Sequence, residues 1–171
     1  VERSRGLGDV YKRQDINNTA IPLSIKDFLE EVYIPMINNL LSSINKNCKD
    51  LKDITIISRT HGQPASPTKL GKEFRVFWIR ITNQLSTLKK IPNSAKFSGA
   101  VGNFNAHKVA YPKIDWKEFG QNFIENELNL NYSFPTTQIE HYDSLAALFD
   151  NCRRINNILL DMSLDLSLIH I

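Results

Sequence analysis

The chain has 171 residues, of which 42% are hydrophobic and 23% charged, and its formal net charge is +3. This is the composition of an ordinary globular protein, and without clustered Lys and Arg it argues against nucleic acid or a membrane surface as a partner. No apolar run reaches the roughly 20 residues of a membrane span, and two cysteines, Cys48 and Cys152, fit no disulfide or zinc spacing, so we expect a cytoplasmic protein without a bound metal.

The first predicted helix begins near Ile25 and continues to Leu51. Apolar side chains recur in it every three or four residues, which keeps one face of a helix apolar. Pro35 lies inside this pattern and cannot donate a backbone hydrogen bond, so we expect a kink or a break there. The apolar face is predicted to comprise Leu29, Val32, Met36, Leu40, Ile44 and Cys48.

The second predicted helix has a start signal in Ser66 and Pro67, since serine can cap a helix and proline suits its first position. It stops near Pro92. Gly71 inside it costs about 1 kcal/mol relative to alanine, which indicates a close approach of another backbone or a ligand. Its apolar face is predicted to comprise Leu70, Phe74, Phe77, Ile81, Leu85 and Leu88.

Two further helices are expected, one over residues 115–128 and one from Asp143 to Leu166 with apolar side chains three and four residues apart, as in a coiled-coil seam. The one strand-like run, residues 54–57, is too short and isolated to build a sheet, so we expect it to lead into a loop. These elements predict an all-α fold, a bundle of long helices with irregular polar loops at the helix ends.

Three such loops carry the chemistry, at residues 53–67, 92–112 and 129–140. The first contains Thr60 and His61, the second has several glycines with asparagines and a histidine, and the third contains Gln138. Hydroxyls, amides and an imidazole suit a polar, anionic small molecule. No phosphate-binding glycine loop or metal-ligand spacing is present.

Each of these residues also has a purely structural interpretation. His61 could bond a loop carbonyl, Gly99 and Gly102 could be turn residues with positive φ, and Gln138 with its neighbouring threonines could cap the next helix. Composition and spacing alone leave these alternatives open.

Longer motifs narrow the choice. The segments SRTHGQPASPTKLGKE (58–73), SGAVGNFNAHKVAYPKIDW (98–116), NYSFPTTQIE (131–140) and LFDNCRRINNILLDM (148–162) resemble, in the same order, the adenylosuccinate lyase family of the fumarase and aspartase superfamily. DINN, at residues 15–18, resembles the end of another family motif. The resemblance covers about residues 15–166, whereas residues 1–14 and 167–171 are expected to be non-native, adapter-like tails.

The resemblance implies the central helical domain of a lyase in purine nucleotide synthesis. Such an enzyme removes fumarate by β-elimination from adenylosuccinate, giving AMP, and from a succinylated carboxamide ribotide. His61 matches the family's general acid, and Thr60 and Gln138 match positions that contact the substrate. No cofactor is implied.

The resemblance also implies that this chain holds only part of a site. The family's general base is a serine on a mobile loop with no match here, so the chain is expected to be inactive alone, and family members are homotetramers that share sites between subunits. Two alternatives remain, namely another lyase or a cycloisomerase of the superfamily, and a non-catalytic helical interaction module.

Overall fold

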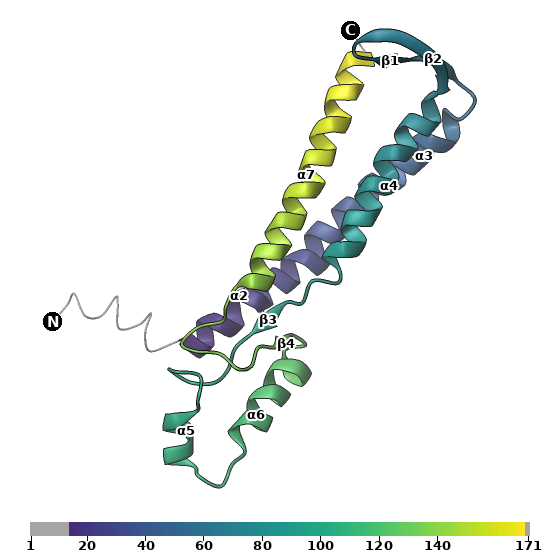
Figure 1. Cartoon of the computed structure of the whole chain (residues 1–171). Helices are drawn as coiled ribbons and strands as arrows, with labels where there is room; N and C mark the ends of the chain where they lie inside the picture. Colours follow the sequence, from purple (N-terminus) through teal and green to yellow (C-terminus); the bar gives the residue numbers. More distant parts are fainter. Residues whose placement is uncertain (1–13, 170–171) are drawn as a thin grey trace, which may run out of the picture. The chain divides into compact units, whose positions relative to one another are not determined.

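The computed structural model describes residues 14–169 and is mostly helical (Figure 1), which confirms the all-α prediction. The predicted tail over residues 1–14 lies outside the described residues except for Gln14, as do residues 170 and 171 of the second predicted tail. None of the described helices is long and apolar enough to cross a membrane. The elements are α2 (Gln14–Phe28), the π-helical η1 (Leu29–Tyr33), α3 (Ile34–Asp50), β1 (Thr55–Thr60), β2 (Gln63–Lys69), α4 (Leu70–Leu88), β3 (Ser94–Ala95), α5 (Asn105–Ala110), α6 (Trp116–Asn122), η2 (Phe123–Glu127), β4 (Asn131–Tyr132) and α7 (Asp143–Ile169).

The chain divides into two compact units. The first, here called the loop unit, comprises residues 14–30 and 91–147, and the second, the bundle unit, comprises residues 31–90 and 148–169. The loop unit is built on a small core of Ala95, Ile124 and Leu130. The strands β3 and β4 pair in parallel beside this core, with Ser94 opposite Asn131.

The bundle unit is held together by the apolar faces of its helices. In α3 the buried side chains are Ile37, Leu41 and Ile44, and α4 packs beside α3 with the predicted side chains Phe77, Ile81, Leu85 and Leu88 buried. The long helix α7 is bonded to α4 through an ion pair between Arg80 and Asp161 at 2.7 Å. Buried Asn151 donates from Nδ2 to Gln84 Oε1 at 3.2 Å as a second link.

The interruption expected near Pro35 is present, because the π-helical η1 ends two residues before it. The predicted apolar face was wrong around this interruption and correct again further along α3. Val32 and Met36 are 42% and 65% exposed and Ile37 is buried instead, whereas Ile44 is buried as predicted. A π-helical turn takes one more residue than an α-helical turn, which moves the side chains directly after η1 around the helix by one position.

Residues 54–57 were wrongly assigned to a loop, since β1 pairs with β2 to form an antiparallel hairpin. The predicted start of the next helix was wrong for the same reason. Ser66 and Pro67 lie in β2, and α4 begins at Leu70 after an extended Lys69 that provides no side-chain cap. Pairing with β1 therefore prevails over the local Ser-Pro start signal.

The close approach predicted at Gly71 is confirmed, and it involves backbone. A Cβ atom on Gly71 would lie 2.5 Å from the carbonyl oxygen of Cys48 at the end of α3. The start of α6 also agrees with expectation, because the Asp115 side chain caps it by accepting from the backbone N–H groups of Lys117 and Glu118.

Candidate functional site

Thr60 and His61 lie at the tip of the β1–β2 hairpin. Thr60 is paired with Gln63, which leaves His61 and Gly62 as a two-residue loop. Both loop residues have positive φ, 50° for His61 and 75° for Gly62, as a type I′ hairpin turn requires. Histidine is one of the few residues other than glycine that tolerate this conformation. The hairpin therefore holds the imidazole out in solvent, where it is exposed.

The stem of this hairpin is held by polar contacts. Lys69 Nζ donates to the hydroxyl of Thr55 across the two strands at 2.9 Å. The Thr68 hydroxyl donates to Glu73 in the first turn of α4 at 2.9 Å. Hydrogen bonds from Lys72 and then Thr68 lower the pKa of the Glu73 carboxyl. These contacts fix the base of the hairpin and so the direction in which its tip projects.

The second and third predicted loops are in contact within the loop unit. The hydroxyls of Ser98 and Thr136 are hydrogen-bonded at 2.9 Å. Gly102 lies against the backbone of the third loop, where a Cβ atom would come within 1.9 Å of the Thr136 carbonyl oxygen. Thr136 thus bonds the second loop, and does not cap α7, which begins at Asp143.

Gly99 and Gly102 are turn residues with positive φ, 76° and 82°, as their structural interpretation predicted. Backbone N–H groups at this turn also bind an anionic group of the chain itself. Ser98 and Gly99 donate their N–H groups to the carboxylate of Asp15 at 3.3 and 2.8 Å. Because the chain's own carboxylate occupies these donors, they are not free for a ligand.

Gln138 is exposed on the third loop, two residues after the buried Thr136. Its amide is therefore available to a ligand, and its backbone position is fixed by the loop contacts described above. Thr60 and His61 belong to the bundle unit and Gln138 to the loop unit.

His107 lies in an aromatic cluster that its sequence spacing did not reveal. Its ring packs edge-on against Trp116 and Phe97, with centroids 4.9 and 5.7 Å away. Its Nδ1 atom is buried without a hydrogen-bond partner among the described residues. Within residues 14–169 no group of three or more His, Cys, Asp and Glu is placed to hold a metal ion.

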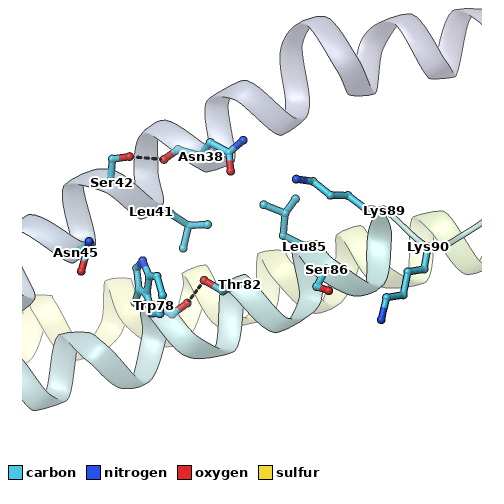
Figure 2. A pocket seen from close by; sticks show the side chains of 10 residues that line it. All are labelled: Asn38, Leu41, Ser42, Asn45, Trp78, Thr82, Leu85, Ser86, Lys89 and Lys90. Carbon is cyan, nitrogen blue, oxygen red and sulfur yellow. Dashed lines mark hydrogen bonds between the residues drawn. The ribbon is translucent and has the colours of Figure 1, made fainter.

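An open groove of about 680 Å³ runs between α3 and α4 (Figure 2). None of Thr60, His61 and Gln138 lines it. Two of its hydroxyls are used within their own helices, since Ser42 donates to Asn38 O and Thr82 to Trp78 O. We therefore do not assign the candidate functional site to this groove. Its lining comprises Asn38, Leu41, Ser42, Asn45, Trp78, Thr82, Leu85, Ser86, Lys89 and Lys90.

Comparison with known proteins identifies a matching family and similar sequences. Residues 11–170 match the family model described as "Lyase". The chain is 48% identical over 156 residues to an adenylosuccinate lyase of Dictyostelium discoideum, covering 90% of this chain and 34% of the relative. It is 40% identical over 152 residues to an adenylosuccinate lyase of Escherichia coli K12, covering 89% of this chain and 33% of the relative.

Among solved structures, a fumarate lyase from Mesorhizobium sp. BNC1 superposes with a TM-score of 0.79 at 23% identity, covering 92% of this chain and 36% of that one. This similarity shows that the fold is shared. The chain spans about a third of the length of the curated relatives that it matches.

Proposed function

The chain belongs to the lyase family whose model it matches, and from this premise we propose that it contributes to a lyase of purine nucleotide synthesis. The reaction we propose is β-elimination of fumarate from adenylosuccinate, giving AMP, and from a succinylated carboxamide ribotide. The names of the relatives from Dictyostelium discoideum and Escherichia coli support this choice.

The observation that carries the proposal is the position of His61. Its imidazole is exposed at the tip of a hairpin whose stem is fixed, beside Thr60 in the last pair of the ladder. In the elimination a base takes a proton from the carbon next to a carboxylate, the carbon–nitrogen bond breaks, and an acid protonates the departing nitrogen. A histidine titrates near neutral pH, so we assign that protonation to His61.

Thr60 and Gln138 are proposed to hold the substrate. The Thr60 hydroxyl adjoins the acid along the chain, so it can orient the group that His61 protonates. The Gln138 amide can donate to a carboxylate or phosphate oxygen without adding charge. Fixing the reacting groups in this way is a large part of what an enzyme contributes to such a reaction.

We propose that the general base is a serine on a loop that family members place after this segment. The 171-residue chain is then expected to be inactive alone. Homotetramer formation and a cytoplasmic location belong to the same proposal. Exposed apolar side chains on α7 support assembly, and two free thiols, Cys48 and Cys152, support a reducing compartment.

The test is a chimera in which residues 15–166 replace the matching segment of the Dictyostelium discoideum relative. We expect the chimera to split adenylosuccinate, and the variant His61→Asn to lower kcat by about 100-fold or more, the usual contribution of a general acid. Asparagine is the informative substitution because it tolerates the positive φ of this turn and removes only the imidazole.

The matched control is His141→Asn, because His141 is an exposed histidine directly after the third loop to which no role is assigned. Its kcat should stay at the chimera's value. If His61→Asn keeps full turnover while circular dichroism shows an intact fold, His61 is a structural turn residue and its proposed role is wrong. If an active chimera prefers another fumarate-releasing substrate, the chain belongs to a different lyase of the superfamily.

A further inference from the structure

The first turn of α2 holds the second loop through a carboxylate. Asp15 Oδ1 forms an ion pair with Lys96 Nζ at 2.7 Å. Lys96 is 0% exposed, and it also donates from Nζ to the carbonyl oxygen of Gly99 at 2.6 Å. Asp15 also accepts hydrogen bonds from the backbone N–H groups of Ser98 and Gly99. All these bonds together fix residues 96–99 onto the helix.

The next turn of α2 holds the third loop through an amide. Asn18 is 2% exposed. Its Oδ1 atom accepts from the backbone N–H of Glu140 at 3.0 Å and from the Tyr142 hydroxyl at 3.3 Å. Its Nδ2 donates to the Gln14 carbonyl oxygen at 2.6 Å, which orients the amide so that the oxygen faces the loop.

Pro22 adds a backbone contact between α2 and the second loop. In a regular helix the Asn18 carbonyl would accept from the backbone N–H four residues later, but proline has none. The Asn18 carbonyl instead accepts from the backbone N–H of Lys96 at 3.3 Å. An interior proline, which normally weakens a helix, here leaves an acceptor free for the loop.

We propose that Asp15 and Asn18 are positioning residues, each of which sets the conformation of one polar loop. Asp15 with Lys96 holds residues 96–102, and Asn18 holds residues 136–142, which carry Gln138. This inference rests on the proposed function, because the loops matter for catalysis only if Gln138 contacts the substrate.

The arrangement is more specific than stability requires. A buried ion pair can often be replaced by apolar side chains without loss of stability, whereas removal of one partner leaves an uncompensated charge. Asp15 and Asn18 provide hydrogen-bond acceptors, which apolar side chains cannot. The loop N–H groups that donate to them are 83, 84 and 122 residues away along the chain.

The first experiment measures amide hydrogen exchange by NMR in the whole chain. In the double variant Asp15→Asn with Lys96→Met, which leaves no unpaired buried charge, exchange at Ser98 and Gly99 should rise about tenfold, as expected for the loss of a charge-assisted hydrogen bond. Exchange at Glu140 should stay constant. In Asn18→Ala exchange should rise at Glu140 and stay constant at Ser98 and Gly99.

Thr19→Ala is the matched control. Thr19 neighbours Asn18 on α2, but among residues 14–169 its hydroxyl bonds only the carbonyl oxygens of Asp15 and Ile16 in its own helix. Exchange in both loops should stay at the parent rate in this variant. Unchanged exchange at the named amides, or equal loosening of both loops by either substitution, would overturn the proposal.

The second experiment measures turnover of adenylosuccinate by the chimera. Asn18→Ala should raise KM by about tenfold, the effect expected when one hydrogen bond to the substrate is misplaced, and should lower kcat by less than that. Thr19→Ala should leave both constants unchanged. If an active chimera keeps its KM in Asn18→Ala, Asn18 does not position the site. If the unsubstituted chimera is inactive, the proposed function fails, and the loop-resolved exchange rates alone decide for or against the positioning of the loops.

Discussion

Two tyrosines lie in surroundings that oppose their ionisation. Burial raises the pKa of Tyr33 far above its usual range, and the neighbouring Cys152 adds to the shift. Burial also raises the pKa of Tyr132, with the negative charge of Asp15 as a second cause. In both cases the folded protein favours the neutral phenol, so the unfolded chain loses its proton first as the pH rises.

The unfolding free energy should therefore fall with increasing pH above about 10, where a tyrosine of the unfolded chain ionises. Below that pH the contribution of both phenols is fully present. We expect Tyr33→Phe to lessen this fall, as measured by urea unfolding between pH 9 and 11 at about 0.5-unit steps. Tyr111→Phe is the control, because Tyr111 is 63% exposed. Equal pH dependence in the parent and in Tyr33→Phe would contradict the assignment.

At the scale of elements, the packing of α3 against α4 depends on one residue without a side chain. Gly71 lies where the end of α3 approaches, with Cys48 O and the backbone of Lys52 within 3 Å of any added Cβ atom. Helix propensity alone would favour alanine at this position by about 1 kcal/mol. The low helix propensity of Gly71 therefore predicted a close approach of another backbone or a ligand, and the structure shows that the backbone at Cys48 and Lys52 makes it.

Gly71→Ala should lower the unfolding free energy by about 1–3 kcal/mol, because the backbone of α3 must move to make room. Urea denaturation followed by circular dichroism measures this change. Gly62→Ala is a useful comparison, since a Cβ atom there would meet nothing within 4 Å and only the positive φ is strained. If Gly71→Ala instead raised the unfolding free energy, the contact of Gly71 with the end of α3 would not restrict the side chain at this position.

The hairpin and the π-helical turn are elements that local patterns did not predict. In β1 exposed and half-buried side chains alternate as far as Arg59, whereas β2 is mostly exposed and does not alternate. The sequence therefore contains one short strand-like run, at residues 54–57, without a second such run to pair with it. In η1 one additional residue in the turn shifted the buried face from Met36 to Ile37, and nothing in the spacing of the side chains reveals that shift.

At the scale of the whole molecule, α7 presents an exposed apolar face. Phe149, Leu160 and Leu164 are 59%, 62% and 63% exposed. Leu160 lies about three helical turns after Phe149, and Leu164 lies about one turn after Leu160, so the three side chains share one side of the helix. An uncovered apolar face of this kind promotes association with another protein surface.

Replacing Phe149, Leu160 and Leu164 together by glutamine should lower the mean mass of the chain in solution, as measured by size-exclusion chromatography with light scattering. The apolar face then no longer gains from being covered. Val109→Gln is the control, because Val109 is 85% exposed in α5 of the loop unit. A parent chain that is monomeric at all concentrations would contradict assembly through this face.

By itself the sequence determined the helical class, the buried face of α4 and the start of a helix near Asp115, because these depend on residues within a few positions of one another. Its motifs indicated the family, which the match over residues 11–170 shows. Tertiary structure decided the turn that presents His61, the π-helical shift, and the contacts of the second loop with Asp15 and of the third loop with Asn18. Those features depend on backbone conformation and on hydrogen bonds between groups as far as 124 residues apart, which no local pattern encodes.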